Sequence, residues 1–189
     1  MHDPALDRTV AQARAGDRAA LAALYDLFAS RVYRFALVRV RSSADAEDLL
    51  QRIFVKVIEG LPRYEERGLP FAAWLFRIAR NTVIDHERTL HEHASLDDIA
   101  QRVDDRAGPE ALADAAFERE TIRTALEQLT PEQRDVIAYR FFAGLSPAEI
   151  GLLMDRREGA IRALQFRAIQ TLRDNLGRDA AAMSSGMIA

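Results

Sequence analysis

The chain has 189 residues, of which 49% are hydrophobic and 29% are charged, a composition typical of a globular protein with room for two small domains. It contains no cysteine, which excludes disulfides and thiolate metal sites, and no run of eighteen apolar residues that would predict a transmembrane helix. The N-terminus, MHDPALDR, lacks the apolar segment of a secretory signal, so we expect a cytoplasmic protein without membrane insertion.

The net charge of −3 hides a segregation along the chain. Residues 17–90 hold twelve basic and ten acidic side chains, residues 119–178 hold ten and eight, and residues 91–118 hold two and eight. Two mildly basic blocks therefore flank an acidic strip. Because phosphate neutralisation supplies most non-specific affinity for DNA, such a chain would bind free duplex weakly, and we expect another partner to help hold it there.

Helical periodicity runs through the first ninety residues. We predict a first helix after Gly16, with Asp17 as its N-cap, that reaches about Val40. A second helix follows Ser42–Ser43 and ends at Gly60-Leu61-Pro62, and a third begins after Pro70. The second helix carries the clearest apolar stripe, at Ala46, Leu49, Leu50, Ile53, Phe54, Val57 and Ile58. We predict that these three helices form a first domain over residues 17–90.

Residues 91–117 are acidic and broken by Gly108–Pro109, which predicts a flexible linker. Strong helical signals then return in residues 118–177. After a helix that ends near Leu129, the segment 130–133 fits a capping box with proline at the first helical position, and the helix that it starts ends at Gly144. The same pattern returns at 146–149. It predicts a short helix over Pro147–Met154, a turn at Asp155-Arg156 and a longer helix from about Arg157 to Asn175.

This order of elements predicts a helix-turn-helix domain. The predicted fold class is therefore all-α, with two small helical domains joined by an acidic linker, and the tail 178–189 is expected to be disordered. In the last helix, the inward stripe is predicted at Ile161, Leu164, Ala168, Leu172 and Leu176. The outward side holds Arg157, Glu158, Arg162, Gln165, Phe166 and Arg167.

Arginine and glutamine read guanine and adenine edges in the major groove, and glutamate accepts a hydrogen bond from cytosine, so the outward side favours DNA binding. The alternative is a solvated basic face of a bundle helix. Asp155 stands where the turn of this motif usually has glycine, and it tolerates the left-handed conformation that the turn needs. It is also the nearest candidate cap for a helix that begins at Arg157 without a hydroxyl.

Two surfaces of the first domain are further candidates. Acidic residues at 45–48 suit the start of a helix, and the polar face continues through Gln51 and Arg52 as a surface for a protein partner. The alternative there is a solvated helix start. Basic residues alternate with aromatic ones from Arg63 to Asn81, as in surfaces that bind single-stranded nucleic acid. The spacing of Phe71 and Trp74 favours core positions, which leaves the basic residues as the contacts.

With these residues in view, the chain resembles the extracytoplasmic-function (ECF) class of bacterial sigma factors over residues 17–176. Residues 45–51, DAEDLLQ, are similar to the polymerase-binding motif of region 2. Residues 71–81, FAAWLFRIARN, with Asp85 and Arg88, are similar to the segment that meets the minus-ten element. Residues 129–134, LTPEQR, and the helix-turn-helix with 162–165, RALQ, resemble region 4.

The resemblance implies a promoter-recognition subunit that binds core RNA polymerase and directs transcription initiation, with no catalytic residue and no cofactor. It implies docking on polymerase through Asp45, Asp48, Gln51 and Arg52. It implies contact with the minus-ten element through Arg63, Arg67, Arg77, Arg80, Asn81 and Arg88, with a flipped base held by the loop 63–69. It implies contact with the minus-thirty-five element through Arg157, Glu158, Arg162, Gln165 and Arg167.

Proteins of this class are often held inactive by an anti-sigma factor, so the resemblance also points to such a partner. Two other interpretations stay open at this stage. One is a helix-turn-helix regulator with a helical N-terminal sensing or dimerisation domain. The other is a helical enzyme or metal protein that uses His86, His91 and His93, although His91 and His93 lack the i, i+4 spacing of paired ligands on a helix.

Overall fold

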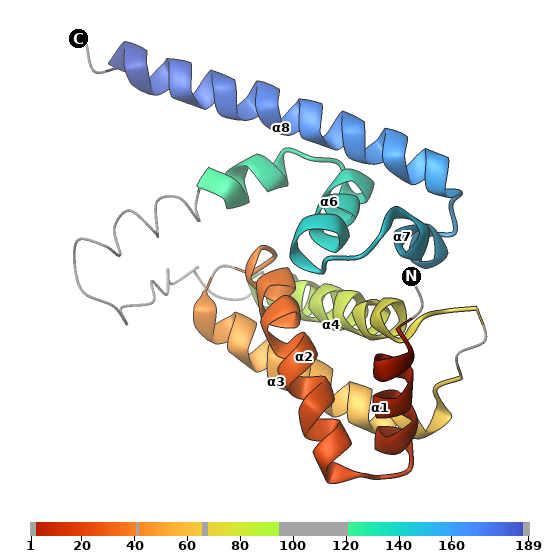
Figure 1. Cartoon of the computed structure of the whole chain (residues 1–189). Coiled ribbons are helices and arrows are strands. Elements are labelled where there is room, and N and C mark those ends of the chain that lie inside the picture. Colours follow the sequence, from red (N-terminus) through yellow and green to blue (C-terminus); the bar gives the residue numbers. More distant parts are fainter. Residues whose placement is uncertain (1–2, 41, 66–67, 95–120, 187–189) are drawn as a thin grey trace. The chain divides into compact units, whose positions relative to one another are not determined.

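The computed structural model describes residues 3–40, 42–65, 68–94 and 121–186, and every regular element in these ranges is a helix. The chain divides into two compact units: α1 to α4 belong to the first, and α6, α7 and α8 belong to the second (Figure 1). The prediction of an all-helical chain is confirmed. The predicted linker 91–117 falls largely outside the described residues.

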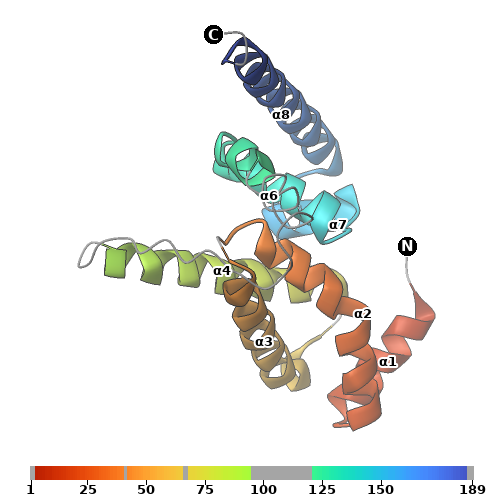
Figure 2. The same ribbon diagram turned by 90° about the vertical axis from the view of Figure 1, so that its left-hand side faces the viewer.

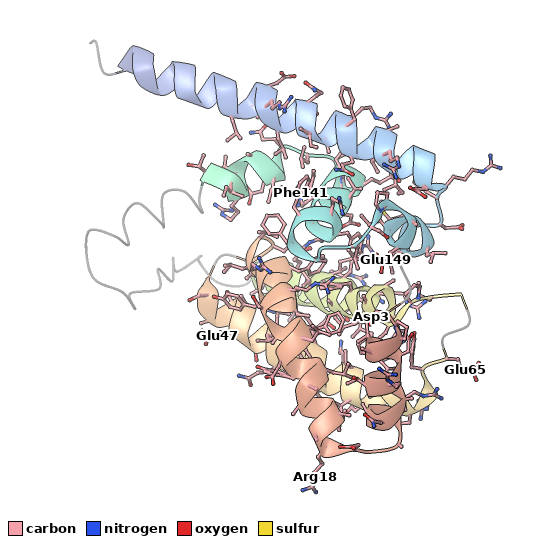
Figure 3. All side chains as sticks on the ribbon, in the orientation of Figure 1. Asp3, Arg18, Glu47, Glu65, Phe141 and Glu149 are labelled. Atoms are coloured by element: carbon pink, nitrogen blue, oxygen red, sulfur yellow. The ribbon has the colours of Figure 1, made fainter. Side chains whose placement is uncertain are left out.

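The first unit contains one helix that the sequence analysis did not predict. Helix α1 (Pro4–Arg14) begins at Asp3, whose carboxylate accepts hydrogen bonds from the backbone N–H groups of Ala5 (2.9 Å) and Leu6 (3.4 Å). It packs against α2 and buries only Val10 and Ala13. Leu6, Val10 and Ala13 stand at i, i+4 and i+7, the spacing of an apolar stripe, so the signal was present in the sequence and the prediction overlooked it. Asp3 is labelled at its start in Figure 3.

The three predicted helices of this unit are present. Helix α2 (Arg18–Leu37) begins at the predicted N-cap Asp17, α3 (Ser43–Gly60) begins at Ser42, and α4 covers Phe71–Ala94. A short 3-10 helix, η1 (Leu61–Arg63), follows α3. Helix α3 packs against both α2 and α4, as Figures 1 and 2 show. The fully buried core side chains include Phe28, Val32, Phe35, Leu49, Ile53, Leu75 and Phe76.

Two features of this unit differ from the prediction. Helix α4 continues to Ala94, so the first four residues of the predicted linker are helical. Ile58, predicted on the buried stripe of α3, is 49% exposed. It stands in the last turn at the edge of a stripe whose centre, Leu49 and Ile53, already fills the contact with the neighbouring helices. The neighbouring helices therefore cover fewer positions of α3 than its apolar stripe contains.

The second unit starts with a helical stretch over residues 121–127. Helix α6 (Pro131–Ile137) follows and passes into a π-helical segment, η2 (Ala138–Phe142). Helix α7 (Pro147–Met154) and helix α8 (Glu158–Gly186) complete the unit, and both α6 and α7 pack against α8. This is the predicted order of helices.

Two features of α8 differ from what we expected. Residues 178–186 continue the helix where we expected disorder, because the run Ala180–Met183 consists of strong helix formers that need no tertiary contact to favour it. Leu176, predicted on the inward stripe, is 40% exposed, whereas its neighbour Asn175 is buried. The predicted buried positions of α8 are thus correct at Ile161, Leu164 and Ala168, but near the end of the stripe the buried residue is one position earlier than predicted.

Candidate nucleic-acid interface

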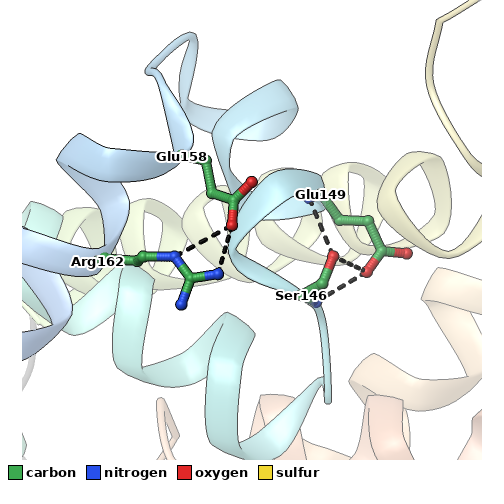
Figure 4. Close-up of polar contacts among 4 residues, drawn as sticks. All are labelled: Ser146, Glu149, Glu158 and Arg162. Carbon is green, nitrogen blue, oxygen red and sulfur yellow. Dashed lines mark hydrogen bonds and ion pairs between the residues drawn. The ribbon is translucent and has the colours of Figure 1, made fainter. Parts of the chain in front are cut away.

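The start of α7 is fixed by a reciprocal capping box. Ser146 Oγ accepts a hydrogen bond from the Glu149 backbone N–H (3.2 Å), and Glu149 Oε2 accepts one from the Ser146 backbone N–H (2.7 Å) (Figure 4). Thr130 and Gln133 form the same device at α6, with distances of 3.0 and 3.3 Å. Both predicted boxes are confirmed. They set where the two helices before the candidate reading helix begin.

The turn between α7 and α8 depends on two residues. Asp155 adopts the left-handed conformation with φ 50° and ψ 50°, as the sequence analysis required of it. Four residues earlier, the carbonyl of Gly151 accepts a hydrogen bond from the Arg156 N–H at 2.9 Å. A Cβ atom on Gly151 would lie 2.6 Å from the Arg156 carbonyl oxygen. The glycine that makes this turn possible therefore stands at 151, a role that the sequence analysis missed.

Contacts within the second unit hold α6 in place on both sides. The Arg134 guanidinium donates to the carbonyl oxygens of Leu126 and Glu127, both at 3.0 Å, and so caps the C-terminal end of the preceding helix. Arg156, in the turn before α8, forms an ion pair with Glu132 in the first turn of α6 at 2.5 Å. The start of α8 is thus tied to the element on which it packs.

Helix α8 has one buried face and one open face. Ile161, Leu164 and Ala168 are buried. Of the residues nominated for base contact, Arg157, Glu158, Arg162 and Arg167 are exposed, and Gln165 is half-buried. Phe166 is 64% exposed, a large apolar surface to leave in water beside basic side chains. Such a ring suits contact with a thymine methyl group in the major groove.

The basic face of the first unit lies on α4. Arg77, Asn81 and Arg88 are exposed at intervals of four and seven residues, which places them on one side of the helix. Arg80 is half-buried. Arg63 is exposed at the end of η1, whereas Arg67 lies outside the described residues. The structure therefore presents four of these six residues to solvent.

A cluster of aromatic rings lies between the ends of the loop 64–70. The ring of Tyr64 is 4.9 Å from that of Trp74 and 5.6 Å from that of Phe71. All three side chains are buried, so the prediction that Phe71 and Trp74 are core residues is confirmed. The Tyr64 hydroxyl donates a hydrogen bond to the Leu69 carbonyl oxygen at 3.0 Å. This bond ties one end of the loop to the other, a feature that the sequence analysis did not predict.

On the candidate docking surface of α3, some polar side chains bond to neighbours in the same helix and others face solvent. Ser42 donates its hydroxyl proton to Asp45 Oδ2 at 2.8 Å, so this acid takes part in the helix cap. Asp48 pairs with Arg52 at 2.7 Å one turn later, and Gln51 is exposed. Val55 (53% exposed) and Ile58 extend the same side with apolar surface. Glu47 projects from α3 in Figure 3.

The metal interpretation receives no support from the part of the chain that the structure describes. No group of three potential ligands occurs there, and the side chains of His91 and His93 are not among the described ones. Within the same ranges, no helix has the length and apolarity needed to cross a membrane.

Comparison with known families assigns both units. Residues 24–92 match the family model of Sigma-70 region 2, and residues 125–174 match that of Sigma-70, region 4. The ECF RNA polymerase sigma factor SigD of Mycobacterium tuberculosis is 35% identical over 182 residues, which is 93% of this chain and 86% of SigD. The chain belongs to the ECF RNA polymerase sigma factors.

Other relatives agree with this membership. The ECF sigma factor BldN of Streptomyces coelicolor is 36% identical over 179 residues, 90% of this chain and 66% of BldN. A structure of CnrH in complex with the cytosolic domain of CnrY covers 90% of this chain and 96% of that chain, at 24% identity with a TM-score of 0.71. A structure of the sigma factor RpoE of Bartonella quintana with the anti-sigma factor NepR covers 81% and 94%, at 21% identity and a TM-score of 0.59. These two structures show the same fold.

As a sigma factor with both regions, the chain binds core RNA polymerase and recognises promoter DNA to direct transcription initiation. The interpretation as a helix-turn-helix regulator with a sensing domain is not favoured, because the N-terminal unit itself matches a sigma region.

Proposed function

We propose that the first unit docks on polymerase and contacts the minus-ten element, and that the second unit recognises the minus-thirty-five element. In this proposal residues 17–90 act as region 2 and residues 118–177 as region 4. The segment between them, acidic from 91 to 117, connects the two and follows a basic channel of the polymerase. Affinity then comes from polymerase and DNA together, which suits a chain whose basic blocks carry only a small excess of charge.

Docking on core polymerase is assigned to the α3 surface of Asp45, Asp48, Gln51 and Arg52. Asp48 and Arg52 already neutralise each other in an exposed pair, which costs little to open. A basic partner surface would compete with Arg52 for the carboxylate, while Gln51 offers both a donor and an acceptor. The partner with this chemistry is the coiled coil of the largest polymerase subunit.

Contact with the minus-ten element is assigned to α4 and the loop before it. Arg77, Asn81 and Arg88 form an exposed row, with Arg80 beside it. The loop between Arg63 and Leu69, which includes Arg67, takes a base flipped out of the non-template strand. Extruding a base costs a few kcal/mol, so the loop must be held in shape, and the Tyr64–Leu69 hydrogen bond supplies such a constraint.

Recognition of the minus-thirty-five element is assigned to the open face of α8, with Arg157, Glu158, Arg162, Gln165 and Arg167. The observation that carries this assignment is the exposure of Arg162 one turn into a helix whose start is fixed by a left-handed turn. That arrangement places an arginine near the N-terminus of the helix after the turn, where recognition helices contact base edges in the major groove.

We further propose that this protein supplies no catalytic residue, since the chemistry of transcription belongs to the polymerase, and that it acts in the cytoplasm, where the polymerase is. An anti-sigma factor is a further proposed partner. Its support is the likeness of this fold to RpoE of Bartonella quintana, which was solved with the anti-sigma factor NepR.

Substitution of Arg162 by alanine tests the assignment of α8. Holoenzyme with this variant should lose discrimination at one upstream base pair by about 1–3 kcal/mol, while its affinity for core polymerase stays unchanged. Arg173→Ala is the matched control, because it removes the same charge from the same helix three turns away. Equal losses on every upstream sequence would make Arg162 a phosphate contact and contradict the assignment.

A further inference from the structure

Glu158 is the one acid among the five side chains assigned to the minus-thirty-five element. It stands in the first turn of α8, and 47% of its side chain is exposed. A carboxylate on a surface that approaches phosphates weakens the attraction that the neighbouring arginines provide. General affinity for DNA therefore does not explain an acid on this face, and one candidate role is a contact with a cytosine amino group.

The carboxylate is already occupied by a neighbour on the same face. Glu158 Oε1 accepts hydrogen bonds from Arg162 Nε (3.1 Å) and from Arg162 Nη2 (2.5 Å), as Figure 4 shows. The two residues are one helical turn apart, and both side chains are about half exposed or more. An exposed pair of this kind contributes little to stability. While it is closed, the pair restricts the directions that the guanidinium group can take.

The geometry of the pair leaves the reading edge of Arg162 open. A guanidinium carries five N–H donors in a rigid planar fork. Glu158 takes the donor on Nε and one donor on Nη2, which form one edge of the fork. The opposite edge, with one hydrogen on Nη1 and the second on Nη2, stays free. A guanine presents O6 and N7 in the major groove and accepts two parallel hydrogen bonds from such an edge.

We propose that Glu158 is a positioning residue that holds Arg162 in the orientation in which its free edge meets a guanine, and that it makes no base contact of its own. This inference rests on the proposed function of α8. Because the arginine is held before DNA arrives, less side-chain freedom is lost on binding. Because the Glu158 carboxylate is negative and neutralises the charge of Arg162, it also reduces attraction to DNA of any sequence. Glu158 thus raises discrimination and lowers non-specific affinity.

The test uses holoenzyme formed from the full chain and core polymerase. The probes are duplexes that carry an upstream element mapped with this holoenzyme, with each base pair replaced in turn. Glu158→Ala should reduce discrimination at the base pair read by Arg162 about two- to tenfold, within the range of coupled neighbours, and should raise affinity for non-cognate duplex. Glu158→Gln, whose amide oxygen can still accept from arginine, should retain part of the discrimination.

A matched control and a double variant complete the design. Glu127→Ala removes another exposed acid from an i, i+4 pair with an arginine, here Arg123, within the same unit and outside the assigned residues, and should leave discrimination unchanged. With Arg162→Ala already present, Glu158→Ala should cause no further loss at that base pair. The inference is overturned if Glu158→Ala leaves discrimination intact, or if it changes a different base pair independently of Arg162. If Arg162→Ala itself alters no base preference, the proposed function of α8 fails and the inference fails with it.

Discussion

A single methyl group at position 151 should disturb the helix-turn-helix. In Gly151→Ala the new Cβ would lie 2.6 Å from the Arg156 carbonyl oxygen, a separation that carbon and oxygen atoms do not tolerate. Either the backbone of the turn moves or the 2.9 Å hydrogen bond from Arg156 N–H to the Gly151 carbonyl weakens. The atom in the way belongs to the backbone, so no side-chain rotation relieves the contact.

The magnitude follows from two opposing effects. Overpacking of a fitted site costs about 1–3 kcal/mol, whereas replacing glycine by alanine inside a helix gains about 0.5–1 kcal/mol. We expect a net loss of about 1–2 kcal/mol in the free energy of unfolding of the second unit. For a unit of this size, each kcal/mol lowers Tm by about 4–8 °C.

Thermal unfolding followed by circular dichroism measures this loss, with Gly159→Ala as the matched control. A Cβ on Gly159 meets no atom within 4 Å, and the residue lies in the first turn of α8. The control should therefore unfold at the same temperature as the original chain or slightly above it. If the two variants prove equally stable, the close approach at Gly151 does not constrain the turn, and our reasoning about it is refuted.

Three other substitutions test separate parts of the account. Asp155→Val places a β-branched residue at φ 50° and should lower the free energy of unfolding by about 1–3 kcal/mol. Asp155→Gly, which tolerates this backbone conformation, should lower it less. Equal melting curves for the two variants would contradict a role for the left-handed turn. Tyr64→Phe removes only the hydroxyl that binds the Leu69 carbonyl, so it should lower stability by about 1 kcal/mol and reduce base discrimination at the minus-ten element in promoter-opening assays. Unchanged base discrimination at the minus-ten element would show that the loop does not need the Tyr64–Leu69 hydrogen bond. Asp48→Arg reverses the charge of the docking surface and should weaken binding to core polymerase in a gel-filtration or fluorescence assay. Asp26→Arg, which makes the same change at an exposed position of α2 outside residues 45–51, serves as its control.

Features with a local cause were predictable from the sequence. The capping boxes at Thr130 and Ser146 need only residues three positions apart, so the sequence alone predicts both. The core stripe at Leu49 and Ile53 follows from helical periodicity, and the exposure of Arg162 follows from the buried Ile161 and Leu164 beside it.

Features that depend on distant or backbone contacts were not predictable in this way. The close approach of Gly151 to the Arg156 carbonyl involves no side chain of its own and leaves no pattern in the sequence. Ile58 belongs to an apolar stripe, but whether a neighbouring helix covers it depends on packing. The pairing of Glu158 with Arg162 was available from their i, i+4 spacing, yet their shared role depends on which guanidinium edge the pair occupies.

The most direct test of the central claim mixes the purified chain with core RNA polymerase and transcribes a library of genomic fragments in vitro. We expect the chain to co-elute with core enzyme and the mixture to start transcripts at defined sites that share two upstream elements. Failure to co-elute, or the absence of any start site that depends on the added chain, would contradict it.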